Sequence, residues 1–341
     1  MASLALTYLN AGELAAHLAH YPKQVLGIAG FGRSAPVDSG DAPLIWVDMP
    51  ILGADTVFEV WTSDTAVIRQ NEDDIDIACN AEMLFGCFET HQLQGESIES
   101  ATFRAYTKIF DCIDRADYPH LWRVWHYFPQ INTMENALER YHGFNVGRYD
   151  AFVANGRMLG EQNAPAACAL GSRNGPLVIY FLAGRQAGIP IENPRQTSAY
   201  HYPEQYGPRS PAFARAMLAG AGRDQKLFIS GTASIVGHAT QHAGDIAAQT
   251  RETLANIRAL LAQAKRAGFD VSTRDQRLFL KVYLHHPDDL PLVRAQVAEE
   301  FGTMLQVVYL QADVCRADLL LEIEGVCGYA NAFPAPLEVS I

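Results

Sequence analysis

The chain has 341 residues, 49% of them hydrophobic, and a formal net charge of -12 at pH 7. This length and apolar fraction are typical of a globular protein with one large core or two ordinary ones, and we favour two domains. The acidic excess argues against nucleic acid as a partner, because phosphate binding needs clustered Lys and Arg. An anionic ligand would therefore need arginines that are concentrated locally.

The N-terminal segment contains apolar side chains but no basic leader. Asn10, Gly12 and Glu13 interrupt its apolar run well short of a membrane span. We therefore expect a cytoplasmic protein with no membrane partner.

Residues 1–145 are expected to form an N-terminal α/β domain, with a strand-like LIWVDMPI and a helix-like TFRAYTKIFDCIDRA, although no chemistry can be assigned to it. A connecting region over residues 146–225 follows. It contains a stretch rich in Pro, Gly and aromatic residues from Ile189 to Pro211, IENPRQTSAYHYPEQYGPRSP. Such a stretch is typical of a long ordered loop, and loops of this length are often functional.

Residues 226–341 show the clearest pattern. KLFISGTASIVG predicts a strand ending at Gly231, and the following helical period predicts a long amphipathic helix, capped by Asp245 at its start and Gly268 at its end. The strand RLFLKVYL, a helix opened by Pro287, and the strands LQVVYLQAD and LLLEIEGVC complete a β-α-β-α-β-β order. This order predicts a mixed sheet with helices on one face only, which leaves the other face in need of a partner.

The cysteines and histidines do not form metal-binding patterns. The six cysteines show no CxxC pair and lie in apolar segments, as buried free thiols do. The pairs His238/His242 and His285/His286 lack a nearby Cys or Glu at ligand spacing. We therefore expect no metal and no cofactor.

Residues 226–341 resemble the reactive-intermediate-deaminase (Rid/YjgF) superfamily, because FISGTASI, GDIAAQTRETLANIRALL and VCRADLLLEIEGV stand in that family's order. The superfamily packs such sheets around a three-fold axis, with ligand sites between neighbouring domains. The resemblance therefore supplies a partner for the uncovered sheet face.

The long N-terminal half, together with GRYDAF and RQTSAYHYPEQYGPRSPAFARA ahead of GTASIVGHATQHAGD, is similar to the chorismatase family. This resemblance implies an α/β (α+β) fold in which the Rid-like domain packs against the N-terminal region in a pseudo-trimer-like arrangement. It implies a secondary-metabolism lyase that cleaves chorismate to pyruvate and 3-hydroxybenzoate, with 4-hydroxybenzoate as a second product. Only Ala317 and Asp318 separate Arg316 from the next strand, where deaminases carry a longer turn, and this departure argues against a deaminase role for Arg316.

Chorismate carries two carboxylates, so its site needs cationic side chains. Arginine suits this task because its planar fork binds a carboxylate bidentately. Our candidates are Arg148 in GFNVGRYD, and Arg209 and Arg215 in GPRSPAFARA, and the resemblance favours Arg148 and Arg209. Arg316 is a further substrate-binding candidate. Arginines in loops are otherwise usually solvated.

The strand LLLEIEG supplies the candidate acid. Alternation places Leu319, Leu321 and Ile323 toward the helices and leaves Glu322 and Glu324 on the opposite face. Burial there would raise the pKa of a glutamate and let it hold a proton near neutral pH. Glu322 is the preferred acid, in agreement with the family resemblance, and Glu324 is the competing assignment. Both could instead lie on an exposed face.

Three further positions are candidates for shaping the site. Tyr200, Tyr202 and Tyr206 could stack on the substrate ring or donate to a carboxylate, with Tyr200 preferred, or simply hold the loop in place. The resemblance places a small residue that determines the enzyme subtype at Ala233. It also implies that Cys315 shapes the pocket of enzymes with an aromatic product, although a free cysteine can equally be a small buried hydrophobe.

The predicted reaction is protonation of the enol ether by Glu322, loss of pyruvate, and aromatisation by loss of the C4 hydroxyl as water. One alternative is a Rid-type imine or enamine deaminase in which Arg316 holds the substrate carboxylate. The other is a non-catalytic protein that binds a small carboxylate. The sequence leaves the oligomeric state and the product isomer open.

Overall fold

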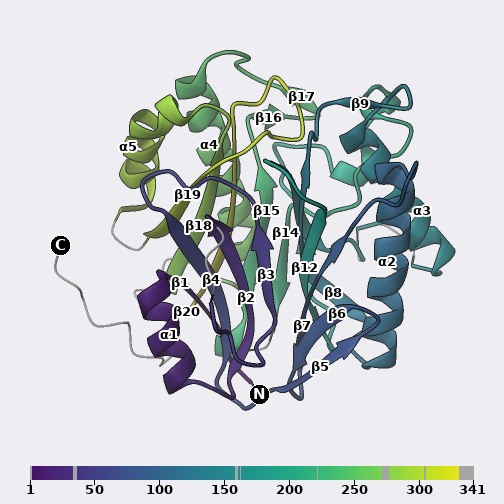
Figure 1. Ribbon diagram of the computed structural model, residues 1–341. Helices are drawn as coiled ribbons and strands as arrows, with labels where there is room; N and C mark the ends of the chain where they lie inside the picture. The colour runs from purple at the N-terminus through teal and green to yellow at the C-terminus, as the bar shows by residue number, and fades with distance from the viewer. Residues whose placement is uncertain are drawn as a thin grey trace.

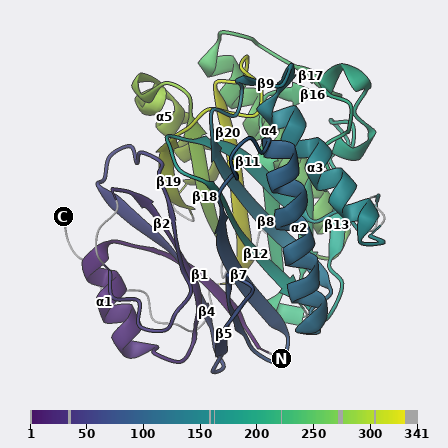
Figure 2. The ribbon, with the colours of Figure 1, turned by 45° about the vertical axis from the view of Figure 1, so that its right-hand side comes forward.

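The computed structural model describes residues 2–33, 37–157, 160–161, 163–220, 222–270, 276–302 and 305–329. Within these ranges the chain forms three main β-sheets that stand side by side, with the long helices on the outside (Figure 1; Figure 2). No helix of the described ranges is both long and apolar enough to cross a membrane. The inner faces of the three sheets pack against one another.

The first sheet has the strand order β1-β4-β2-β3. Its elements are β1 (Leu4–Leu9), α1 (Ala11–His20), β2 (Val25–Gly32), β3 (Leu44–Val47) and β4 (Thr56–Ser63). Helix α1 begins with a capping box formed by Asn10 and Glu13. The side chain of each residue accepts a hydrogen bond from the backbone N–H of the other. Leu14 is fully buried and anchors this helix to the sheet.

The second sheet has the strand order β11-β8-β12-β7-β6-β5. Its strands are β5 (Ile68–Glu72), β6 (Ile75–Cys79), β7 (Met83–Thr90), β8 (His120–Pro129), β11 (Ala166–Ser172) and β12 (Leu177–Gly184). The helices α2 (Ile98–Arg115) and α3 (Arg140–Ala154) cover its outer face. A hairpin of β9 (Met134–Glu135) and β10 (Leu138–Glu139) precedes α3.

The third sheet contains the predicted Rid-like elements and has the order β13-β14-β15-β20-β18-β19. Its strands are β13 (Ile189–Ile191), β14 (Ala216–Ala219), β15 (Lys226–Thr232), β18 (Gln276–Leu284), β19 (Leu305–Gln311) and β20 (Leu321–Tyr329). The helices α4 (Ile246–Arg266) and α5 (Leu290–Phe301) cover its outer face, and β16 (Ile235–Val236) and β17 (Ala239–Thr240) form a hairpin after β15. Asp245 caps α4 and Gly268 follows it with a φ of 94°, so the predicted order and both caps are confirmed.

The three sheets repeat one topology. Each sheet contains a core of four strands, which are β1 to β4 in the first sheet, β7, β8, β11 and β12 in the second, and β15, β18, β19 and β20 in the third. In each core the last strand lies between the first and the second and is antiparallel to both, and the third strand runs parallel to the second. The central strands are β4, β12 and β20, and the parallel pairs are β2/β3, β8/β11 and β18/β19. The predicted pseudo-trimer-like α/β fold is therefore confirmed, and the region ahead of residue 185 supplies two of the three sheets.

Three aromatic residues, one from each sheet, occupy equivalent positions in the repeated topology. Phe31, Tyr127 and Tyr283 lie near the ends of β2, β8 and β18. The Phe31 and Tyr127 ring centroids are 5.8 Å apart, and the hydroxyl oxygens of Tyr127 and Tyr283 are 2.9 Å apart. Their partners on the three central strands are Val57, Val178 and Glu322. One of three equivalent positions therefore carries a carboxyl group, and the other two carry valine.

A balanced set of charges is buried where the sheets meet. Lys281 Nζ lies 2.7 Å from Glu59 Oε2 and 2.9 Å from Glu324 Oε1, and Arg123 forms an ion pair with Glu324. These four residues are at most 3% exposed. Because two cations face two carboxylates, the pairing offsets much of the cost of removing the charges from water.

The predicted domain boundaries do not coincide with the sheets. α3 continues across the boundary at residue 145, and the predicted connecting region 146–225 supplies β11 and β12 to the second sheet and β13 and β14 to the third. β12 is buried along its whole length, so its sequence is a continuous apolar run without the alternation that identifies a half-exposed strand. Leu319 also departs from its prediction, because it precedes β20 and packs against Ala233 and Val314 rather than the helices.

Candidate active site

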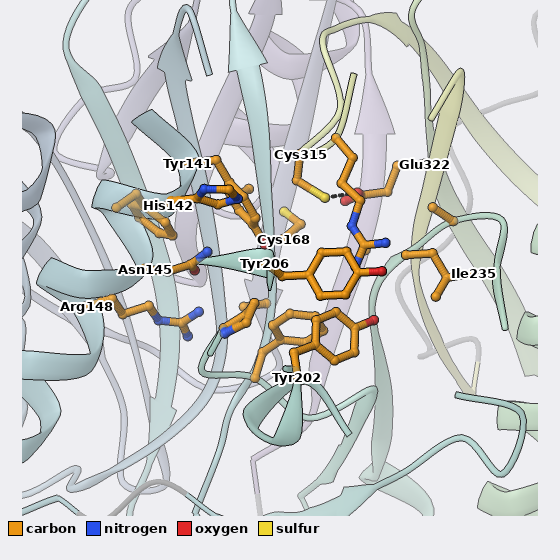
Figure 3. Close-up of a pocket in the computed structure, with 18 of the residues that line it drawn as sticks. Tyr141, His142, Asn145, Arg148, Cys168, Tyr202, Tyr206, Ile235, Cys315 and Glu322 are labelled. Carbon is orange, nitrogen blue, oxygen red and sulfur yellow. Dashed lines mark hydrogen bonds between the residues drawn. The ribbon is translucent and has the colours of Figure 1, made fainter. Parts of the chain in front are cut away.

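A cavity of about 150 Å³ lies between the second and third sheets (Figure 3). Its wall is formed by α3, β11, β15, β20, the segment just ahead of β20, and the loop over residues 192–215. The lining residues are Glu139, Tyr141, His142, Phe144, Asn145, Arg148, Ala167, Cys168, Ala169, Tyr202, Tyr206, Pro211, Phe213, Arg215, Gly231, Ala233, Ile235, Cys315, Arg316, Ala317 and Glu322. Eight of the eleven candidates named from the sequence are among them, and the other three are Tyr200, Arg209 and Glu324.

Glu322 on β20 places a buried carboxyl group in the wall of this cavity. It is 4% exposed, and burial raises its pKa to about 8, although the positive charges of Arg123 and Arg215 work in the opposite direction. Its Oε2 lies 4.0 Å from the sulfur of Cys315, as the dashed line in Figure 3 marks. Burial and the neighbouring Glu322 raise the pKa of the Cys315 thiol to about 12. Both groups therefore carry protons near neutral pH.

Glu324 lies on the same face of β20 but belongs to the central charged cluster. In addition to its contacts with Arg123 and Lys281, it accepts a hydrogen bond of 2.5 Å from the Tyr283 hydroxyl. These three contacts engage the Glu324 carboxyl group, which does not line the cavity. Glu322 is therefore the better candidate for a proton donor.

Two arginines bring buried hydrogen-bond donors to the cavity. Arg148 and Arg215 are 2% and 3% exposed. Nε and Nη2 of Arg148, and Nε of Arg215, have no hydrogen-bond acceptor in the part of the chain that the structure describes. The amide nitrogen of Asn145 is in the same situation. Because unpaired buried donors cost free energy, this group is suited to bind an anion that enters the cavity.

The Nη2 group of Arg215 holds the loop in place. It donates to the backbone oxygen of Thr197 at 2.7 Å and to the Tyr202 hydroxyl at 2.8 Å. The guanidinium also lies over the rings of Tyr202 and Phe213, at 5.5 and 5.2 Å from their centres. Arg215 thus fixes the loop aromatics and keeps one N–H group for a ligand.

Arg316 closes the cavity at the side of the β16–β17 hairpin. Its guanidinium lies 4.0 Å from the Tyr206 ring centre, and its Nη1 donates to His238 O at 2.9 Å and to Thr240 Oγ1 at 3.3 Å. Tyr206 and His238 are themselves within hydrogen-bonding distance, at 3.2 Å. These contacts hold Arg316 in the wall of the cavity.

Tyr200 and Arg209 do not line the cavity. Tyr200 lies in a 3-10 turn over Ala199–His201, which turns its side chain toward Glu192 and Ser198, whereas Tyr202 follows the turn and reaches the cavity. Arg209 has a side chain that is 49% exposed, and it pairs with Asp150 at 3.3 Å and stacks on Tyr149. The prediction that these two residues lie at the site is therefore corrected.

The sequence analysis did not identify the contribution of α3 beyond Arg148. Tyr141, Asn145 and Arg148 are spaced four and three residues apart and therefore share one face of the helix. That spacing, counted back from Arg148, is a signal that could have found them. Cys168 on β11 carries no comparable signal.

The unpaired N–H groups of Asn145, Arg148 and Arg215 could bind an anion in the cavity. Among the described residues, no three His, Cys, Asp or Glu side chains come together as metal ligands would. All six cysteines are free thiols, as the sequence predicted.

Comparison with known proteins finds relatives that are named as chorismatases or as a 3-hydroxybenzoate synthase. A family model for the N-terminal part of FkbO/Hyg5-like chorismatases matches residues 59–183. A 3-hydroxybenzoate synthase of Streptomyces hygroscopicus is 37% identical over 316 residues, which cover 89% of this chain and 92% of that protein. A chorismatase of Streptomyces rapamycinicus is 37% identical over 278 residues, covering 79% of this chain and 81% of the relative.

One solved structure matches nearly the whole chain. A chorismatase crystal structure matches 96% of this chain and 99% of its own with a TM-score of 0.85 and 33% identity. A Rid-family protein of Yersinia pestis matches 34% of this chain and 86% of its own at 24% identity, with a TM-score of 0.28. The resemblance to chorismatases identified from the sequence motifs is confirmed by the relatives that cover most of the chain, and the chain belongs to the chorismatase family.

Proposed function

We propose that this protein cleaves chorismate to pyruvate and 3-hydroxybenzoate, as the name of its Streptomyces hygroscopicus relative describes for that enzyme. The observation that carries the proposal is the buried Glu322, whose pKa of about 8 leaves it protonated at neutral pH beside a cavity with unpaired arginine donors. A protonated carboxyl group is what cleavage of an enol ether requires.

The two arginines suit the two carboxylates of chorismate. Arg148 comes from α3 and Arg215 from the end of the loop, so they approach the cavity from different elements. Their unpaired N–H groups would form charge-assisted hydrogen bonds with the substrate. Tyr202 offers an aromatic surface between Arg215 and Arg316.

In the proposed reaction Glu322 transfers its proton to the methylene carbon of the enolpyruvyl group. The resulting oxocarbenium ion adds water, and the hemiketal releases pyruvate, which leaves a hydroxyl at ring carbon C3. Loss of the C4 hydroxyl with the C3 hydrogen as water then makes the ring aromatic. One water is consumed and one released, so chorismate is converted to pyruvate and 3-hydroxybenzoate without net change in other reactants. We propose that the chain needs no metal or redox cofactor for these steps and acts in the cytoplasm.

Cys315 is placed to influence the outcome. Its sulfur lies beside Glu322 and its side chain lines the cavity, so its size limits where the intermediate can lie. We propose that it favours the aromatic product, with 4-hydroxybenzoate as a minor second product. Arg316 is less suited to the deaminase alternative, because its hydrogen bonds and stacking already join it to the cavity wall.

The test is incubation of the purified chain with chorismate, with pyruvate followed by a coupled assay and aromatic acids separated by chromatography. Pyruvate and 3-hydroxybenzoate in equal amounts are expected. Glu322→Gln should abolish pyruvate release while chorismate still binds. Pyruvate with a non-aromatic dihydrodiol would contradict the proposed product, and no pyruvate at all would contradict the proposed function.

A further inference from the structure

Two buried polar side chains lie behind Arg148 and take no part in the reaction proposed above. Tyr106 on α2 and His126 on β8 are fully buried. The Tyr106 hydroxyl oxygen lies 2.7 Å from His126 Nε2, and His126 Nδ1 lies 2.6 Å from the backbone oxygen of Cys168. Fully satisfied polar networks of this kind fix the orientation of their members.

The direction of each hydrogen bond follows from the chemistry of the partners. A carbonyl oxygen can only accept, so His126 Nδ1 carries a proton and donates it to Cys168. Burial, assisted by the charge of Arg148, lowers the pKa of His126 well below its usual value, so the ring is neutral and Nε2 accepts. Tyr106 must then donate its proton to Nε2, which leaves its oxygen as an acceptor with a fixed orientation.

The guanidinium of Arg148 lies over the ring of Tyr106. The guanidinium carbon lies 5.2 Å from the centre of the Tyr106 ring and 5.9 Å from that of Phe152. Burial raises the pKa of Tyr106 to about 12, and the positive charge of Arg148 opposes that rise. The arginine therefore lies over the ring face of Tyr106, close enough for its charge to act on the hydroxyl.

We propose that Tyr106 and His126 are positioning residues that hold Arg148 with Nε and Nη2 available to a carboxylate in the cavity. The contacts run from the backbone oxygen of Cys168 through His126 and Tyr106 to Arg148. Because the Cys168 side chain also lines the cavity, these contacts tie the arginine to β11 in the cavity wall. A donor fixed before the ligand arrives loses less conformational entropy on binding. The inference rests on the proposed function, because the carboxylate is taken to be that of chorismate.

The substitution that isolates this role is Tyr106→Phe. It removes one hydroxyl and keeps the aromatic ring against Arg148. We expect the KM for chorismate to rise about tenfold, the order of loss of one buried hydrogen bond, because the ring beneath Arg148 loses the contact with His126 that fixes its orientation, while kcat changes less than about twofold because Glu322 is untouched. The Kd of 3-hydroxybenzoate, measured by titration calorimetry, should weaken by a similar factor.

Tyr118→Phe is the matched control. The Tyr118 hydroxyl is also buried and donates to the backbone oxygen of Asn80, and its ring packs in the same helix-covered core as Tyr106. This control should lower the melting temperature to a similar extent but leave KM unchanged.

The outcomes separate the inference from the function on which it rests. If the wild-type chain cleaves chorismate and Tyr106→Phe has an unchanged KM and Kd, the positioning role is refuted and the proposed function stands. If both Tyr→Phe variants raise KM equally, the effect is a general loss of packing and the positioning role is again refuted. A wild-type chain that neither cleaves chorismate nor binds 3-hydroxybenzoate would refute the proposed function, and the inference with it.

Discussion

Gly231 on β15 and Glu322 on β20 lie so close together that the space between them cannot hold one methyl group. A Cβ atom at Gly231 would lie 1.9 Å from Glu322 Oε1 and 3.3 Å from Cys168 Cβ. The carboxyl group of Glu322 thus lies directly against the backbone of the neighbouring strand. The missing side chain at position 231 defines where the candidate acid is held.

We predict that Gly231→Ala lowers kcat for chorismate cleavage by about 100-fold, because displacing a reacting group by about 1 Å costs that order of rate. The displaced carboxyl is near the Cys168 side chain, so the substitution also disturbs the cavity wall. Steady-state kinetics check the prediction. Gly12→Ala is the control, because a Cβ there meets only Asn10 Oδ1 at an ordinary 3.5 Å, and activity equal to that of wild type is expected.

The raised pKa of Glu322 predicts the pH dependence of both activity and stability. The acid form is present below about pH 8, so kcat should fall as the pH rises through that value. A glutamate whose folded pKa lies above its unfolded value stabilises the fold fully below the unfolded pKa, and this stabilisation is lost as the pH rises toward 8. The melting temperature of the wild type should therefore decline relative to that of Glu322→Gln between pH 5 and 8. Parallel melting curves of the two proteins across this range would contradict the assignment.

Cys315→Ala is predicted to change the products more than the rate. The thiol lies 4.0 Å from Glu322, and its removal enlarges the cavity where the intermediate aromatises. We expect pyruvate release to continue and the share of 3-hydroxybenzoate among the ring products to fall, as measured by chromatography. An unchanged product ratio would mean that Cys315 only fills space in the wall.

Arg148 and Arg209 were equally favoured by the family resemblance, and the structure separates them. Arg148 is buried with unpaired donors, whereas Arg209 is half exposed and paired with Asp150. We predict that Arg148→Met raises the KM for chorismate by about 100-fold, since one charged partner of a carboxylate is lost, and that Arg209→Met changes it less than about twofold. A large effect at Arg209 would show that the loop adopts another arrangement when substrate binds.

Much of the third sheet could be predicted because its segments have clear periods and end signals. Asp245 and Gly268 delimit α4 as expected, and strand alternation placed Glu322 on the inner face. β12 has no such alternation, because its residues are buried on both faces. The sequence therefore predicts one α/β domain over residues 1–145 and a connecting region after it, although the part of the chain ahead of residue 185 contains two sheets.

The site was less predictable than the strands because its loop has no regular period. A single 3-10 turn decides that Tyr202 reaches the cavity and that Tyr200 does not. Ion pairs between residues far apart in the sequence are equally difficult to predict. Nothing in the spacing of Glu59 and Lys281 along the chain indicates that they form a buried ion pair 2.7 Å long.

The three-fold repeat has an energetic consequence for a chain that carries all three sheets. In an assembly of three identical subunits, every buried carboxylic acid appears three times, and the free-energy cost of removing it from water is incurred three times. Here Val57 and Val178 occupy the positions equivalent to Glu322, so that cost is incurred once. Joining the repeats in one polypeptide allows two of the junctions to specialise in stability while the third carries the chemistry.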